Sequence, residues 1–191
     1  GHESTAMVLL NNNANVNICQ QNGVSPLLAA CDYGYKGIAE RLLNKGAKMN
    51  LYSKKGLSPL VVACKNGHED IVQLLLSRGA AVSNVENNGI SPLFEACLSS
   101  HYNIVKFLLC YGADVNSGTK EQTLGITPLW ISCKNRDERI TELLLEHGAN
   151  PNFRSKEINA FKYLPSPLRI ATNNGDHRIV QLLLEYGARP N

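Results

Sequence analysis

Gly56-Leu57-Ser58-Pro59-Leu60 opens the stretch that decides the fold, which continues to residue 80 as GLSPLVVACKNGHEDIVQLLLSRGA. Ser58 can cap a helix, because its hydroxyl oxygen can accept a hydrogen bond from an unpaired backbone N–H. Pro59 at the first helical position removes no donor that the helix needs. Gly67 supplies the left-handed conformation that ends this short helix. A second helix follows, with an apolar stripe of Ile71, Val72, Leu74 and Leu75.

The same pattern recurs along the chain at intervals of 33, 33, 36 and 39 residues. Its two markers are a Ser/Thr-Pro-Leu tripeptide, beginning at Ser25, Ser58, Ser91, Thr127 and Ser166, and a Gly-Ala pair, beginning at Gly46, Gly79, Gly112, Gly148 and Gly187. Such a period predicts stacked units that bury each other's apolar stripes. We expect an all-α solenoid of helix-turn-helix units with extended β-turn fingers between them. Its units are a partial one at 1–16 and full ones at 17–49, 50–82, 83–115, 116–151 and 152–191.

These residues make the chain similar, over essentially its whole length, to the ankyrin repeat family. The resemblance implies a module for protein–protein recognition within a larger intracellular protein, binding a protein or peptide on its concave face of finger tips and short helices. It implies no cofactor. An alternative is a structural or regulatory segment, packed intramolecularly against neighbouring domains of a channel, kinase, ligase adaptor or transferase. Fold alone does not decide between them.

Carried over by position, the resemblance also implies which residues contact the partner. They are Tyr33, Tyr52, Lys54, Lys55, Lys65, Leu98, Lys120, Trp130, Lys134 and Arg154, with Asn66, Asn135 and Asn174 beside them. The lengthened last finger adds Phe153, Phe161 and Tyr163 as candidates. Lysine and arginine outnumber acidic residues on this face, so an acidic or mixed-charge partner is expected. The alternative is a solvated face without selectivity.

Two departures from the period carry the aromatic candidates. The finger at 116–127 is longer than its predecessors by three residues, and the finger at 152–166 by six. Insertions in repeat proteins map to loops on one face, often the binding face. Phe153, Phe161 and Tyr163 in the second finger are therefore either partner contacts or a cover for the loop itself. Trp130 is either packed beneath the fingers or an exposed binding anchor.

Ser100 and Arg136 replace the glycine between the two helices of their units. A side chain in the left-handed region costs roughly 1 kcal/mol, which a stack can tolerate. We interpret both as local relaxations of the turn, without functional meaning.

Cysteine placement indicates reduced thiols. Cys31, Cys64, Cys97 and Cys133 occupy one repeat position, and adjacent helices pack at about 8–10 Å, beyond the reach of a disulfide. An intracellular location, cytoplasmic or nuclear, is therefore expected.

The remaining composition argues against several classes of protein. The net charge of +3 is small for a nucleic-acid binder, and no apolar run is long enough to span a bilayer. No cysteine and histidine spacing matches a zinc site, and no phosphate loop is present. We therefore expect no metal, no catalysis, no nucleic acid and no direct membrane insertion.

The residues at the two ends suggest that the sequence is a segment of a longer array. We expect this segment to be monomeric in isolation. The first residues match half a unit, and the last helix keeps its apolar residues where a terminal unit would turn polar. Gly1-His2 fits the repeat but could equally be a cloning remnant.

Overall fold

The computed structural model describes residues 3–12, 14–83, 90–117, 126–153 and 164–190. This part of the chain contains eleven helices and no strand. In chain order the helices are α1 (Glu3–Asn11), α2 (Pro26–Asp32), α3 (Lys36–Asn44), α4 (Pro59–Asn66), α5 (Glu69–Ser77), α6 (Pro92–Leu98), α7 (Tyr102–Cys110), α8 (Pro128–Asn135), α9 (Glu138–Glu146), α10 (Pro167–Asn174) and α11 (His177–Glu185).

The repeated tripeptide starts each short helix as its chemistry predicts. Ser58 has extended backbone, and its hydroxyl oxygen accepts a hydrogen bond from the backbone N–H of Val61, 3.2 Å away. The same cap, with proline in the first helical turn, begins α2, α6, α8 and α10. The leucine of the tripeptide points into the core in every unit, as Leu93 (0% exposed) and Leu129 (1%) show.

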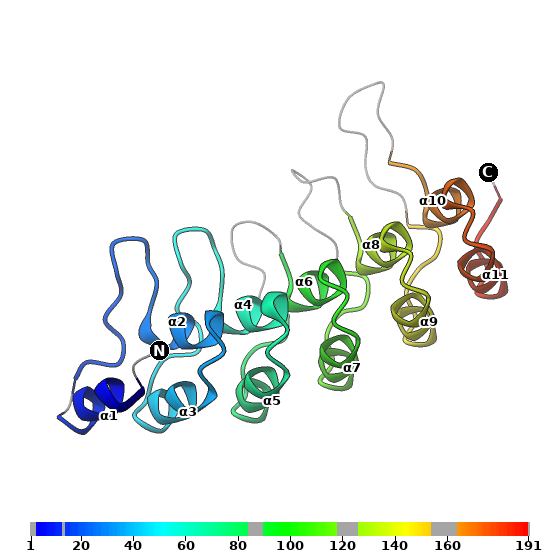
Figure 1. The fold of residues 1–191 in the computed structure, drawn as a ribbon. Coiled ribbons are helices and arrows are strands. Elements are labelled where there is room, and N and C mark those ends of the chain that lie inside the picture. Colours follow the sequence, from blue (N-terminus) through cyan, green and yellow to red (C-terminus); the bar gives the residue numbers. More distant parts are fainter. Residues whose placement is uncertain (1–2, 13, 84–89, 118–125, 154–163, 191) are drawn as a thin grey trace.

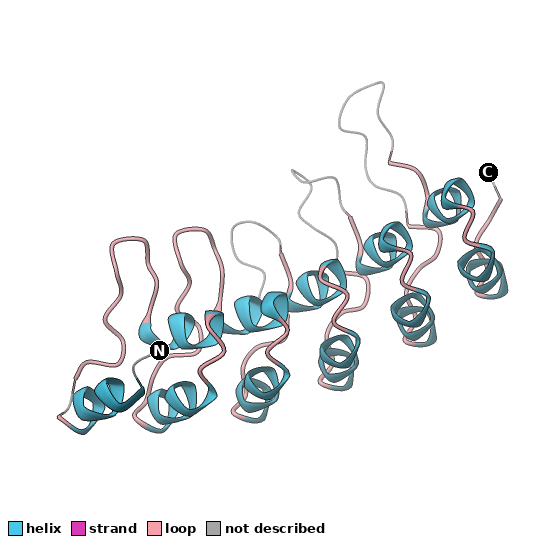
Figure 2. Ribbon diagram, in the orientation of Figure 1, coloured by secondary structure: helices cyan, strands magenta, loops and turns pink. Residues whose placement is uncertain are grey.

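The helices form two rows, as predicted for a solenoid (Figure 1). We call α2, α4, α6, α8 and α10 the inner helices and α1, α3, α5, α7, α9 and α11 the outer helices. Each inner helix packs against the next inner helix and against the outer helix that follows it. The described loops that precede α2 and α4 extend from the inner row towards the same side, and the stack bends towards that side (Figures 1 and 2).

The apolar stripe of the outer helices differs by one residue from the prediction. In α5, Ile71, Val72 and Leu75 are buried as expected, but Leu76 is buried too, whereas Leu74 is only half-buried. The stripe is displaced because α5 packs against the outer helices α3 and α7 on either side as well as against its own inner helix α4.

The loop between α3 and α4 is a turn rather than a strand pair. Ser53 donates its backbone N–H to Leu57 O at 3.0 Å, and Gly56 donates to Ser53 O at 2.8 Å. The loop is also tied to the preceding finger, because the Lys54 N–H donates to Asn22 O at 2.8 Å. Neighbouring fingers therefore support each other at this end of the stack.

The six cysteines are free thiols. Cys31, Cys64, Cys97 and Cys133 are buried in the core, and Cys19 and Cys110 are exposed. Burial raises the pKa of Cys31 and of Cys133 to about 12, and raises the pKa of Cys64 and Cys97 as well. The four buried thiols are therefore protonated at neutral pH, which suits a packing role and not a nucleophile.

Candidate interaction surface

Three of the predicted contact residues form a row across the inner helices. Lys65, Leu98 and Lys134 hold the same repeat position, in the last turn of α4, α6 and α8, and all three are exposed. Leu98 is 44% exposed, whereas the residues before it on α6, from Pro92 to Cys97, are buried. We call these three residues the exposed row. It presents one apolar side chain with one positive charge on each side of it.

Trp130 lies one turn before Lys134 on α8 and is half-buried. Its indole N–H donates a hydrogen bond to Pro165 O at 3.0 Å, which ties it to the loop preceding α10. The Lys134 ammonium lies 5.5 Å from the centre of its ring, within reach of a cation–π interaction. Trp130 therefore has a structural role beneath the loop, and its ring also borders the exposed row.

The other described candidates are spread along the stack. Tyr33 ends α2, is 69% exposed and stacks on Tyr35 with ring centres 5.9 Å apart. Lys54 and Lys55 are exposed at the loop between α3 and α4, in which Tyr52 is half-buried.

Phe153 is half-buried in the loop after α9, at the other end of the stack from Tyr33. Lys120, Arg154, Phe161 and Tyr163 lie outside the described residues. Among the candidates that the structure describes, the exposed row and Trp130 thus form the local group on the inner helices.

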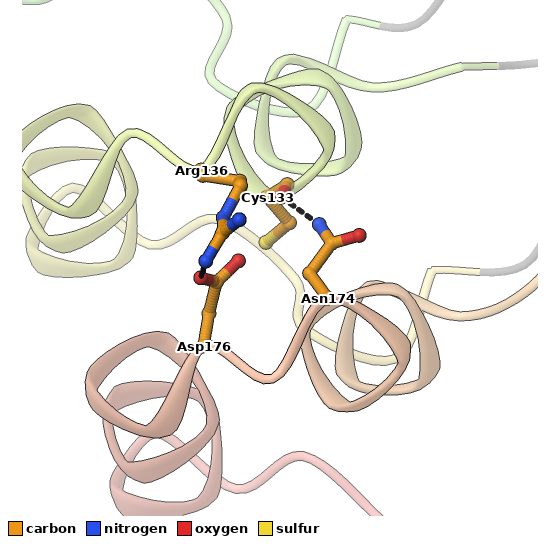
Figure 3. Close-up of polar contacts among 4 residues, drawn as sticks. All are labelled: Cys133, Arg136, Asn174 and Asp176. Atoms are coloured by element: carbon orange, nitrogen blue, oxygen red, sulfur yellow. Dashed lines mark hydrogen bonds and ion pairs between the residues drawn. The ribbon is translucent and has the colours of Figure 1, made fainter.

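The three asparagines beside the row join neighbouring units through their side-chain amides. Asn66 donates its side-chain amide to Asp32 O at 2.8 Å, and Asn135 donates to Leu98 O at 3.1 Å. Asn174 donates to Cys133 O at 3.3 Å (Figure 3). Each amide thereby satisfies a carbonyl at the end of the preceding inner helix, where the helix itself offers no partner. Their role is to join neighbouring units.

The turn between the two helices of a unit depends on the unit that follows. Gly67 has φ +77°, and a Cβ there would lie 2.7 Å from the ring of His101. His101 Nε2 lies 3.2 Å from Lys65 O, so the ring fills the space over this turn. Gly34 and His68 repeat the arrangement one unit earlier, with the same 2.7 Å approach.

Ser100 and Arg136 occur where that histidine is absent. Both keep a positive φ, of 56° and 61°, but the next units have Asp137 and Asp176 in place of histidine. The Arg136 Nε and Nη2 atoms lie 2.8 and 2.7 Å from Asp176 Oδ1 (Figure 3). Arg136 is thus not a mere relaxation of the turn, as we had interpreted it. It replaces the glycine–histidine contact with an ion pair between units.

Glu95 is a feature of this face that the sequence analysis did not single out. It lies on α6, is only 6% exposed, and its Oε2 has no hydrogen-bond partner in the described part of the chain. Burial raises the pKa of its carboxyl above the usual 4.5, while Lys65 acts in the opposite direction. The repeat pattern alone distinguishes Glu95, because the equivalent residues of the other full units are all apolar: Ala29, Val62, Ile131 and Ile170.

We expect Glu95 to make stability depend on pH. Because the pKa is higher in the folded than in the unfolded chain, the folded state binds more protons, so the free energy of unfolding falls as pH rises from about 4.5 through the folded-state pKa. Each pKa unit is worth about 1.4 kcal/mol. Glu95→Gln should therefore gain stability relative to the unmodified protein over this window, and the gain should be constant above it. Urea unfolding across this pH range, with the exposed Glu40→Gln as control, measures the difference. A difference independent of pH would contradict the assignment.

Two other kinds of feature are metal-binding clusters and membrane-spanning helices. No cluster of histidine, cysteine, aspartate and glutamate there could hold a metal ion. Among the same residues, no helix has the length and apolar character to cross a membrane.

Comparison with protein families agrees with this geometry. The model for ankyrin repeats (3 copies) matches residues 37–119 and 117–191. The chain belongs to the ankyrin repeat family. Ankyrin repeats are generally protein–protein interaction modules and generally not enzymes. A search of curated proteins finds no match to the chain. The two-row stack, the tripeptide caps and the inter-unit asparagines are thus the ankyrin architecture of this chain.

Proposed function

We propose that this ankyrin stack binds a protein or peptide across its inner helices and loops, as a module of a larger intracellular protein. The exposed row supports the proposal. Lys65, Leu98 and Lys134 repeat in register on three adjacent helices, whereas the neighbouring asparagines are used to join the units. Two lysines around an apolar side chain suit a partner with acidic and apolar groups. Trp130 borders this surface with aromatic area, the kind of side chain that dominates binding energy.

The rest of the proposal follows from the chemistry of the chain. We infer that this segment performs no catalysis, takes no cofactor and does not bind nucleic acid. Reduced, buried thiols support a place in the cytoplasm or nucleus. The isolated chain is expected to be monomeric, which light scattering after size-exclusion chromatography measures.

The binding face is tested by charge reversal and capture. The chain is used to isolate a partner. The affinity of that partner is then measured for a triple variant that combines Lys65→Glu, Leu98→Asp and Lys134→Glu. We expect at least a tenfold loss, because a like charge facing an acidic partner repels it. The control is Lys106→Glu on the outer helix α7, which should bind normally. Loss of binding with the control alone would place the interface on the outer helices and overturn the proposal.

The intramolecular alternative predicts a different contact for the same face. Cross-linking through Lys65 and Lys134 in the intact protein separates the two. Cross-links to another domain of the same polypeptide would favour a structural or regulatory segment. Cross-links to a separate protein would favour recognition of a partner.

A further inference from the structure

Glu95 carries an inference about what the partner contains. Its carboxylate is buried among the inner helices at a position that every other unit fills with an apolar side chain. A buried charge without hydrogen bonds is costly, and each such group in a folded protein requires an explanation. Packing does not explain it, because Val62 and Ile131 fill the same place in the units on either side.

Glu95 also lies directly beside the exposed row. Leu98 follows it by three residues on α6, so the two share a helix face. Lys65, on the preceding inner helix, is close enough for its charge to act on the carboxylate. The acid therefore lies one turn before Leu98 on α6, within reach of the charge of Lys65. Lys65 is exposed and its side chain is long, so it can leave this place without disturbing the stack.

The following inference rests on the proposed function. We propose that Glu95 receives a lysine or arginine side chain from an extended peptide that crosses α4, α6 and α8. The peptide's cation supplies the hydrogen bond that Glu95 Oε2 lacks. Lys65 turns from Glu95 to an acidic residue of the peptide on one side, and Lys134 meets a second acidic residue on the other. Leu98 covers the apolar stem of the bound basic side chain.

The spacing of the units sets the spacing of these charges. Adjacent helices pack about 10 Å apart, and an extended chain advances about 3.3 Å per residue. One unit therefore corresponds to about three residues of peptide. The expected pattern is acidic-x-x-basic-x-x-acidic, in which x is any residue. Since the pattern is symmetrical, it holds for either direction of the peptide.

Selection from a phage library of random dodecapeptides tests the inference. The immobilised chain should enrich peptides with this charge pattern, and Glu95→Gln should not. Glu40→Gln, an exposed change on the outer helix α3, is the matched control and should select the same peptides as the unmodified chain. In solution, Glu95→Gln should lower the affinity of a selected peptide about 10- to 100-fold, since a hydrogen-bonded charge is worth roughly that factor. Replacing the peptide's basic residue with alanine should have the same effect and remove the sensitivity to Glu95.

Each other outcome decides against the inference in a recognisable way. Peptides without a basic residue, equal binding by Glu95→Gln, or no enrichment at all would overturn it. Selected peptides that do not depend on Glu95 can still lose binding when Lys65, Leu98 and Lys134 are changed. The proposed binding face then stands without the role of Glu95. If they bind despite those changes, the proposed face fails as well. Circular dichroism of each variant separates lost binding from lost folding, and Glu95→Val, which copies Val62, is a second variant whose fold the neighbouring unit already supports.

Discussion

Replacing Gly67 with alanine should lower the free energy of unfolding by about 2 kcal/mol. An alanine at φ +77° carries a backbone strain of roughly 1 kcal/mol. Its Cβ would also lie 2.7 Å from the His101 ring, so the ring must move away from Lys65 O. The lost hydrogen bond adds about 1 kcal/mol. Thermal and urea unfolding measure the change.

Gly79 provides the matched control for this prediction. It belongs to the same unit and has φ +83°, but a Cβ there has no neighbour within 4 Å. Gly79→Ala should therefore show the backbone cost of about 1 kcal/mol alone. In a double-mutant cycle, His101→Ala should remove most of the extra cost of Gly67→Ala. Equal destabilisation by the two glycine substitutions would show that His101 does not require the glycine.

Arg136→Ala should destabilise the chain by about 2 kcal/mol. The Asp176 side chain is only 9% exposed, and its Oδ2 has no hydrogen-bond partner in the described residues, so Arg136 is the charge that compensates it. Removing one member of a fully buried ion pair costs about 3–5 kcal/mol, and the 62% exposure of Arg136 reduces that figure. Both arginine and alanine carry the strain of positive φ, so the difference measures the lost pair. The change is measured by urea unfolding at low and high salt.

A second ion pair between units serves as the control. Arg178 and Glu142 lie 3.2 Å apart, but both side chains are nearly half exposed, and such surface pairs contribute about 0–1 kcal/mol. Arg178→Ala should therefore have little effect, and that effect should vanish in high salt. The double variant Arg136→Gly with Asp176→His rebuilds the glycine–histidine contact of the earlier units and should recover most of the stability. If the double variant were no more stable than Arg136→Ala, the two contacts would not be equivalent.

The candidate surface was only partly predictable from the sequence. The positions of Lys65, Leu98 and Lys134 followed from the period, because equal repeat positions lie on the same face of equivalent helices. The period did not predict which polar side chains at the helix ends are hydrogen-bonded to a neighbouring unit. Asn135 and Lys134 are adjacent in sequence and both exposed, yet the asparagine amide is hydrogen-bonded to the preceding inner helix, whereas the lysine ammonium lies over the Trp130 ring of its own helix.

The sequence by itself determined the units of this protein. Proline and a capping hydroxyl start each inner helix, and glycine ends it in three of the five units. The spacing of apolar residues gives each unit a stripe that its neighbours must cover. Each of these signals lies within a few residues of the chain. Only the tertiary structure decided how one unit constrains the next. Gly67 is needed because of His101, and Arg136 compensates Asp176; the residues of these two contacts are 34 and 40 positions apart. The burial of Glu95, whose Oε2 has no hydrogen-bond partner among the described residues, depends on the whole surroundings of that side chain. Stacking alone brings such groups together, because the period places distant residues side by side.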